Sequence, residues 1–166
     1  QILGAPGMRH DSTWGWPNTK TGARGFDEAL PILIKGCRAI TEFGADLGIK
    51  TMVENHGYFC QDSERMEKLV NGVDHPNFGV LLDMGNFLVV DEDPAQAAGR
   101  LMPYTFHVHV KDFHVKSGHE PSPGQGWFLS RGGNSGVLSI EFEGMEDPLQ
   151  AILIGLENLR RYMANL

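Results

Sequence analysis

The sequence predicts an α/β fold whose strands form a parallel sheet, and three observations support this. Short apolar runs alternate along the chain with longer segments in which apolar residues recur at helical spacing. The short runs are continuously apolar, which is typical of strands that helices cover. Polar residues able to carry chemistry follow the strands at their ends. A (β/α) barrel and an open doubly wound sheet both build a site at this edge of the sheet.

Length and composition agree with one globular unit. The chain has 166 residues, of which 41% are apolar, so we expect a single domain over residues 1–166 with a buried core. The net charge of −7 and the absence of a basic stripe argue against a nucleic-acid partner. No run of about 18 apolar residues predicts a membrane span, so we expect no membrane partner. Cys37 and Cys60 lie in unrelated contexts and indicate no disulfide framework, which favours a cytoplasmic location.

The first half of the chain contains three predicted strands and two helices. The opening apolar stretch, residues 1–8, is predicted to be a strand, and the polar segment 9–25 a loop. Because the chain begins with Gln1 at a strand whose partners would precede it, we expect a fragment or the loss of an N-terminal part. Residues 26–49 are predicted to be a helix closed by Gly48, and residues 49–54 a strand. Asp62 or Ser63 caps the next helix, and residues 78–86 form a strand. The apolar faces expected on the two helices are Leu30, Leu33, Ile34, Cys37, Ile40 and Phe43 on the first, and Met66, Leu69, Val70 and Val73 on the second.

The second half continues the alternation, with one break. Asp93 and Pro94 begin a short helix, residues 106–115 (FHVHVKDFHV) form a strand, and residues 137–143 form another. Asp147 and Pro148 begin the last helix, residues 148–163. The face expected to be buried on it is Leu149, Ile152, Leu156 and Leu159. Residues 114–136 are rich in glycine, serine and proline and show no helical period, although a crossover helix is expected between parallel strands.

Three carboxylates and one histidine at consecutive strand ends make a hard oxygen and nitrogen ligand set: Glu54, Asp83, His109 and Glu141. Such a set suits Mn²⁺, Mg²⁺ or Co²⁺, and Zn²⁺ less distinctively. Carboxylates gathered at one edge of a sheet repel each other unless a cation neutralises them. Each residue alone could be an ordinary strand-end or turn residue, and Glu143 shares its face with Glu141. Their occurrence in phase at four strand ends favours a metal site.

The strand 106–115 concentrates titratable groups on one face. His107, His109 and Lys111 alternate with Val108 and Val110, so the first three project to the same side. His109 is nearer the carboxyl end, where the carboxylates gather, and we expect it to be the ligand. His107 is deeper and is expected to support it, and Lys111 is a possible substrate contact near the mouth.

Other polar and aromatic residues lie in predicted loops. His114 and His119 are expected to be solvated, His75 is a turn residue, and His10 belongs to the opening loop. Trp14 and Trp16 could wall a sugar site, or they could simply pack on the surface. No nucleophile elbow, P-loop or dinucleotide-binding glycine pattern occurs in the sequence.

The motifs MVENHG, GVLLDMGNF, HVHVKDF and LSIEFEGMEDPLQAI, followed by GLENLRR, resemble the sugar phosphate isomerase/epimerase family of xylose isomerase-like TIM barrels. The resemblance covers nearly the whole chain and implies a (β/α)8 barrel. A full barrel needs about 250 residues, so this one is expected to be incomplete, with the later strands and helices only. An incomplete barrel exposes sheet edges, and we therefore expect a homo-oligomer, most simply a dimer.

The resemblance also implies a chemistry. One divalent metal ion (Mn²⁺, Mg²⁺, Co²⁺ or Zn²⁺) would be held by Glu54, Asp83, His109 and Glu141. Glu54 and Glu141 would be the catalytic residues, exchanging a proton on a small sugar or sugar phosphate through an enediolate. The substrate-binding residues expected are His56, Asn86, His107, Lys111 and Trp14. The chain departs from the family pattern at Asn86, where epimerases usually carry a histidine. The arginine that often follows the strand of the metal histidine in this family is not evident here, and Lys111 and Lys116 are the nearby cations.

Other functions of the same scaffold remain open. A polyol dehydratase, which is a lyase, would use the same metal site. A truncated barrel could also fold without turning over substrate. A phosphodiester-cleaving enzyme would need further metal ligands and a basic track for DNA, which the net charge of −7 disfavours.

Overall fold

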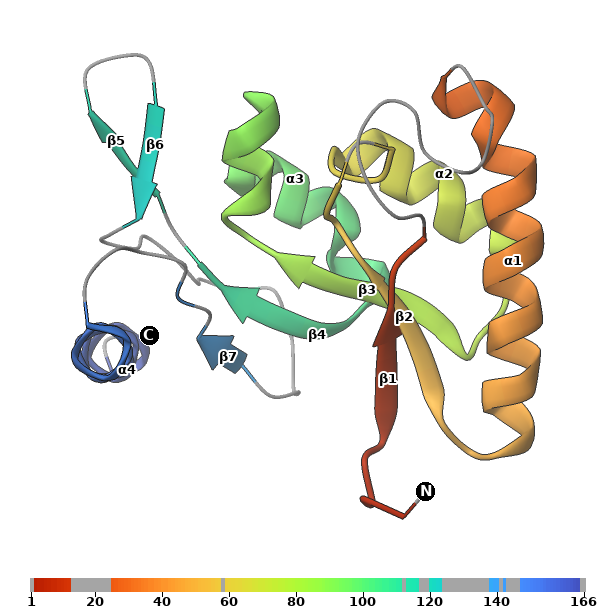
Figure 1. The fold of residues 1–166 in the computed structure, drawn as a ribbon, viewed down its shortest axis with the longest axis horizontal. Helices are drawn as coiled ribbons and strands as arrows, with labels where there is room; N and C mark the ends of the chain where they lie inside the picture. Colours follow the sequence, from red (N-terminus) through yellow and green to blue (C-terminus); the bar gives the residue numbers. More distant parts are fainter. Residues whose placement is uncertain are drawn as a thin grey trace.

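The structure is a computed structural model that describes residues 2–12, 25–57, 59–111, 113–116, 120–123, 138–140, 142 and 147–164. Its main feature is a five-stranded sheet in the order β1-β2-β3-β4-β7, with every neighbouring pair parallel (Figure 1). The strands are β1 (Gly7–His10), β2 (Lys50–Glu54), β3 (Phe78–Asp83), β4 (Thr105–Val110) and β7 (Leu138–Ile140). The predicted parallel α/β fold is confirmed, in the form of a half-barrel.

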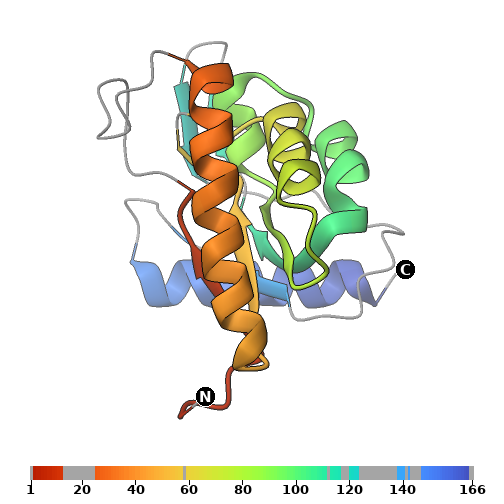
Figure 2. The same cartoon turned by 90° about the vertical axis from the view of Figure 1, so that its right-hand side faces the viewer.

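Helices follow the strands and cover one face of the sheet. They are α1 (Phe26–Asp46), α2 (Ser63–Val73), α3 (Pro94–Leu101) and α4 (Pro148–Met163), with two 3₁₀ turns, η1 (Asn86–Val90) and η2 (Met102–Tyr104). Figure 2 shows α1, α2 and α3 side by side on this face. Between these three helices and the sheet lies the main core, which includes Leu33, Met66, Leu69, Val80, Leu82, Phe87, Leu101 and Val108. Among the described residues, no helix is long and apolar enough to cross a membrane.

The predicted helix starts are confirmed by side-chain caps. The Asp62 carboxylate accepts the Arg65 N–H at 2.9 Å, and Asp93 accepts the N–H groups of Ala95 and Gln96 at 2.7 and 3.1 Å. Asp147 accepts the Gln150 N–H at 2.9 Å. Each bond satisfies a backbone donor that the first helical turn leaves open. The apolar face predicted for α2 is buried as expected.

The buried face of α1 differs from the prediction. Leu33 and Cys37 are buried, but Ile40 and Phe43 are 38% and 67% exposed, whereas Thr41 and Gly44 are buried in their place. The reason is that α1 lies very close to β2. The Thr41 hydroxyl is 2.7 Å from the Thr51 hydroxyl, and a Cβ on Gly44 would lie 2.8 Å from the Ile49 carbonyl oxygen. Small and polar residues make this close packing possible, and an apolar pattern does not reveal them.

Two strand predictions are wrong in their bounds. The opening strand begins at Gly7 and includes Arg9 and His10, which were assigned to a loop. The stretch 106–115 is not one strand, because β4 ends at Val110. The chain then forms β5 (Phe113–Lys116), which pairs antiparallel with β6 (Glu120–Pro123) away from the main sheet (Figure 1). Part of the predicted loop 114–136, including His114, is therefore a hairpin, while residues 124–137 lie outside the described residues.

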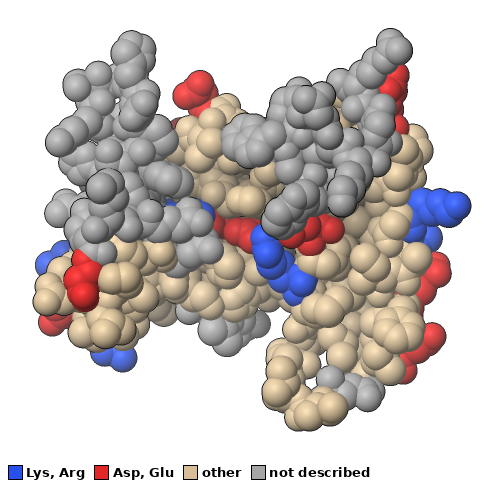
Figure 3. All heavy atoms as spheres, in the orientation of Figure 1, with Lys and Arg blue, Asp and Glu red and all other residues tan. Residues whose placement is uncertain are grey.

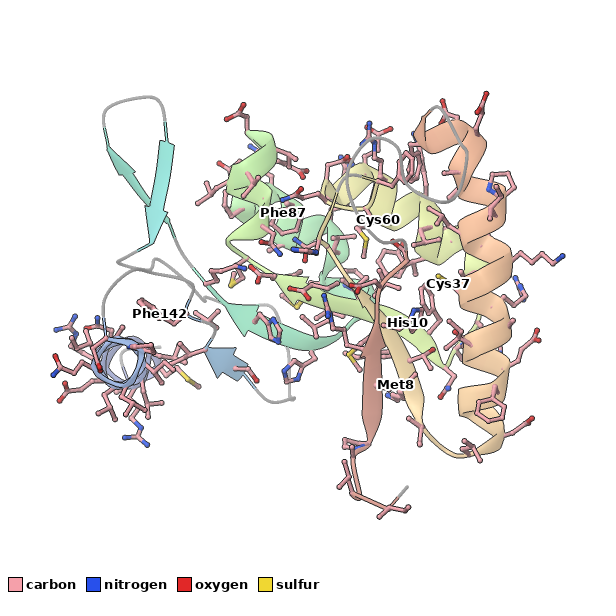
Figure 4. The ribbon with its side chains drawn as sticks, in the orientation of Figure 1. Met8, His10, Cys37, Cys60, Phe87 and Phe142 are labelled. Atoms are coloured by element: carbon pink, nitrogen blue, oxygen red, sulfur yellow. The ribbon has the colours of Figure 1, made fainter. Side chains whose placement is uncertain are left out.

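The buried face of the last helix differs from the prediction, and the last strand lies within its predicted range. Strand β7 spans three residues, and Phe142 follows it beside α4 (Figure 4). Within α4, Leu159 is buried, but Leu149 and Ile152, which were expected on the buried face, are 74% and 38% exposed. The close approach to the sheet is at Gly155, where a Cβ would lie 3.5 Å from the Ile140 side chain.

Candidate metal centre

Three of the four predicted ligands converge at the carboxyl ends of neighbouring strands. Glu54 ends β2, Asp83 ends β3, and His109 lies next to the end of β4. One ligand atom from each lies within 4.8 Å of the other two. His109 Nδ1 is 3.5 Å from Glu54 Oε1 and 3.9 Å from Asp83 Oδ2. In Figure 3, acidic and basic atoms lie next to one another near the middle of the face shown. Glu141, the fourth predicted ligand, lies outside the described residues.

Strand alternation explains why these side chains share a face. The residue before each ligand, Val53, Leu82 or Val108, is buried in the core under the helices, so the ligand itself points to the other side of the sheet. A bulge in β4 puts its histidines on the same face of the sheet as the carboxylates. Val80 is opposite Thr105, but Leu81 is opposite His107, which leaves one extra residue in β4. If the ladder continued from the Val80–Thr105 pair without the bulge, His107 would lie opposite Leu82 and both histidines would point toward the helices.

Asp83 is held rigidly. It is completely buried, and its Oδ1 atom accepts the N–H groups of Gly85 and Asn86 at 2.9 and 3.1 Å. Its backbone is bound on both sides by Asn55, whose Nδ2 donates to the Asp83 carbonyl at 2.8 Å and whose Oδ1 accepts the Asp83 N–H at 2.6 Å. Asn55 therefore joins the ends of β2 and β3. The Oδ2 atom of Asp83 is left to face His109.

Two cations lie beside the carboxylates. Arg9 Nε is 2.7 Å from Glu54 Oε2, and the same guanidinium binds Asp11 at 2.9 Å. Lys111 Nζ is 3.3 Å from Asp83 Oδ2. Burial, the largest single influence, raises the pKa of Glu54, but the interactions with His109, Arg9 and His56 together outweigh it. The pKa of Glu54 is therefore lowered, and this buried carboxyl is ionised at neutral pH.

His107, two residues before His109 on β4, contacts the ring of His109 and a residue of β7. Its Nε2 atom is 2.9 Å from the Ser139 hydroxyl of β7, and its ring packs edge-on against that of His109, with centroids 5.6 Å apart. Burial, followed by the charge of His109, lowers the pKa of His107, which favours the neutral ring. These contacts hold the half-buried His107 ring next to that of His109.

The other predicted site residues have different positions. Asn86 is buried beside the ligands, its Nδ2 is 3.5 Å from Glu54 Oε1, and its carbonyl accepts from Gln61 at 3.2 Å. Lys111 is also buried, whereas His56 is exposed. Trp14 lies outside the described residues. His75, as expected, is a turn residue, since its ring accepts the Asn77 N–H at 3.1 Å.

Sequence reasoning missed Arg9, Asn55 and Ser139. Asn55 follows Glu54 directly, so its place at a strand end was a usable signal. Arg9 was hidden because the first strand was expected to end before it. The contact of Ser139 with His107 depends on the pairing of β4 with β7, which joins residues far apart in the sequence.

The arrangement fits one divalent cation. With metal–ligand bonds of about 2.0–2.2 Å, two ligand atoms of one ion lie at most about 4.4 Å apart. The distances from His109 Nδ1 to the two carboxylates, 3.5 and 3.9 Å, fall within this limit. Carboxylate oxygens with one imidazole nitrogen form the hard donor set that Mn²⁺, Mg²⁺ and Co²⁺ accept. Glu54, Asp83 and His109 could therefore hold such an ion.

Several known proteins are similar to this chain in sequence or in fold. The chain is similar to the inosose dehydratase of Geobacillus thermodenitrificans (strain NG80-2), with 23% identity over 122 residues, covering 73% of this chain and 41% of the relative. Its fold is similar to that of 3-keto-D-glucoside 4-epimerase from E. coli, with a TM-score of 0.71, 18% identity, and coverage of 96% of this chain and 65% of the epimerase. A D-tagatose 3-epimerase-like protein gives a TM-score of 0.67 and 23% identity, with coverage of 87% and 58%.

The chain thus spans less than two thirds of the length of each of these relatives. At such identities, the two structures establish the fold alone. The family model described as xylose isomerase-like TIM barrel matches residues 3–162, which is nearly the whole chain. With its parallel half-barrel and its outer helices, the chain belongs to the xylose isomerase-like TIM barrel family.

Proposed function

We propose that this chain carries the metal and acid–base centre of a divalent-metal-dependent isomerase or epimerase acting on a small sugar or sugar phosphate. The observation that supports it most is the convergence of Glu54, Asp83 and His109 within 4.8 Å at three adjacent strand ends. The family and the epimerase folds support a carbohydrate substrate.

Glu54, Asp83 and His109 would hold the cation, and Glu141 is the proposed fourth ligand. A divalent cation at such a site supplies a Lewis acid that stabilises negative charge on a substrate oxygen. The rigid support of Asp83 by Asn55 and by the N–H groups of Gly85 and Asn86 keeps its Oδ2 atom directed toward His109. Such support reduces the reorganisation that ligand binding requires.

Glu54 is the proposed base. Arg9 binds one oxygen of its carboxylate, and the other, Oε1, faces His109 and Asn86. Because its pKa is lowered, Glu54 is ionised and can accept a proton from the carbon next to the substrate carbonyl. The C–H bond breaks, its electron pair forms the double bond of an enediolate, and the carbonyl oxygen takes the negative charge. Glu141 is the proposed acid that returns a proton to carbon from the other face.

Further residues around the ligands are proposed to bind the substrate. Asn86, buried beside Glu54, is proposed to orient a substrate oxygen where relatives use a histidine. Lys111 is a proposed contact for a negatively charged substrate oxygen, and His56 and Trp14 are proposed contacts at the mouth. The ring of His107 is bound to Ser139, so its proposed influence on substrate passes through the position of His109.

Solvent-exchange experiments test the proposal. The protein, loaded with Mn²⁺ or Co²⁺, would be incubated in deuterated water with a panel of ketoses, keto-sugars and their phosphates. We expect deuterium at the carbon next to the carbonyl, metal-dependent and lost in E54Q and E141Q. The control is E64Q, because Glu64 is an exposed carboxylate paired with Lys68 at 2.7 Å away from the site. Exchange that persists in E54Q would contradict the proposed base.

A dehydratase is the second candidate, favoured by the likeness to inosose dehydratase. Mass spectrometry of the product separates the two reactions, since a dehydratase removes one water from the substrate and an epimerase leaves its mass unchanged. A barrel that folds without turnover would show neither product. Its metal content would then show whether the ligand set is still used.

The open sheet edges support a proposed pairing with a second copy. Within the described residues, β1 and β7 each pair with one neighbour only. Exposed parallel strands offer backbone groups for association. Light scattering coupled to size-exclusion chromatography gives the mass in solution, and a monomer at all concentrations would refute the pairing.

A further inference from the structure

We propose that the Lys111 ammonium is a tethered counter-ion that occupies the cation position beside Asp83 and must leave when a divalent cation binds. Lys111 therefore sets the metal affinity of the site. This inference rests on the proposed metal site at Glu54, Asp83 and His109.

Asp83 has one oxygen atom to offer a cation. Its Oδ1 is occupied by the N–H groups of Gly85 and Asn86 at 2.9 and 3.1 Å. Its Oδ2 lies 3.9 Å from His109 Nδ1, so an ion shared with His109 would be bound through Oδ2. Lys111 Nζ is 3.3 Å from the same atom. A metal ion and the ammonium thus compete for one oxygen.

The path of the Lys111 side chain is restricted. A Cβ at Gly85 would lie 2.8 Å from the Lys111 carbonyl oxygen and 3.0 Å from its Cγ, so the turn after β3 packs directly on the lysine. The side chain is only 5% exposed. This packing directs the aliphatic stem toward Asp83, and the ammonium cannot simply extend into solvent without moving its stem.

Each of the two described carboxylate ligands is paired with a cation before any metal is added. Glu54 and Asp83 carry two negative charges, and Arg9 and Lys111 carry two positive ones within ion-pair distance. Arg9 binds Glu54 Oε2, whereas Glu54 Oε1 faces His109, so Arg9 leaves the site-facing oxygen open. Among the described cations, Lys111 is the one paired with the ligand oxygen itself. A divalent cation at Asp83 Oδ2 would compete with the Lys111 ammonium for this oxygen and would be repelled by its positive charge.

The test is a metal titration of metal-free wild type, K111M and K68M. Methionine keeps much of the length of the stem and removes the charge. Lys68 is a control because its ammonium pairs with exposed Glu64 at 2.7 Å, away from the site. Cobalt absorption and calorimetry with Co²⁺ and Mn²⁺ report affinity without requiring turnover. We expect K111M to bind at least about tenfold more tightly than wild type, a difference of about 1.4 kcal/mol, and K68M to match wild type.

Thermal unfolding adds a second readout. Metal-free K111M should melt below wild type, because the buried Asp83 carboxylate loses its counter-charge, and its melting temperature should rise more on adding Co²⁺. If K111M does not fold without metal, K111Q, which keeps a neutral donor, is measured with the same expectation. Equal or weaker binding by the variant would overturn the inference while leaving the proposed metal site intact. Absence of metal binding in both wild type and the variants would overturn both.

Discussion

Replacing Asn55 with alanine should destabilise the fold and weaken the metal site together. The Asn55 side chain is fully buried and makes two hydrogen bonds with the backbone of Asp83, at 2.8 and 2.6 Å. The substitution N55A leaves the Asp83 N–H and carbonyl buried without these partners. Each buried polar group that loses its partner costs about 1–3 kcal/mol, so for the two groups we expect a loss of roughly 2–6 kcal/mol.

Urea unfolding followed by circular dichroism measures this loss, with N158A as the control. Asn158 accepts one exposed hydrogen bond from Arg161 at 3.0 Å, and its removal should cost no more than about 0.5 kcal/mol. The stabilisation of N55A by added Co²⁺ should also be smaller than that of wild type, because Asp83 is less firmly held. A loss below about 1 kcal/mol in N55A would refute the argument that Asn55 joins the ends of β2 and β3.

Three further outcomes follow from packing and titration. G44A should lower the free energy of unfolding in urea by about 1–3 kcal/mol, because its Cβ would lie 2.8 Å from the Ile49 carbonyl oxygen. G36A on the same helix is the control; its Cβ would have no atom within 4 Å, so this change should be neutral or stabilising. Burial raises the pKa of Cys37 to about 12 and of Cys60 to about 11, so both thiols should react with Ellman's reagent at about pH 8 only upon unfolding; rapid reaction of the folded protein would contradict this. Burial lowers the pKa of His10, so the unfolded state binds more protons than the folded state below about pH 6.5. The free energy of unfolding should therefore fall as the pH drops from about 6.5 through the folded pKa. The variant H10Q should lose less stability over this pH range than wild type, and an equal loss in both proteins would contradict the role of His10.

Local rules were enough to predict the helix starts and the strand-end positions of three of the four candidate ligands. Asp62, Asp93 and Asp147 were recognisable because a cap satisfies donors within its own first turn. Glu54 and Asp83 were recognisable because each ends a continuous apolar run. Parallel strands then bring their carboxyl ends to one edge, whatever the details of packing.

Residues whose role depends on pairing between distant segments were harder to predict. The burial of Thr41 and Gly44 follows from how closely α1 approaches β2, and hydrophobicity does not encode that distance. Strand β4 ends at Val110, and the Met84 N–H, just after β3, donates to the His109 carbonyl at 3.3 Å; this pairing joins segments far apart in the sequence. Arg9 was assigned to a loop because its strand carries exposed and polar residues at a sheet edge.

The register of the sheet makes the lengths of the acidic side chains matter. Asp83 is level with His109, but Glu54 is level with Leu81, two residues earlier along β3. Two residues of parallel strand correspond to a step of about 6.6 Å, so Glu54 starts lower than the other ligands. The extra methylene of glutamate helps to span this step, and the shorter aspartate suits the upper level. Exchanging the two acids would keep the charge but misplace both oxygens, so in this half-barrel aspartate and glutamate are not equivalent.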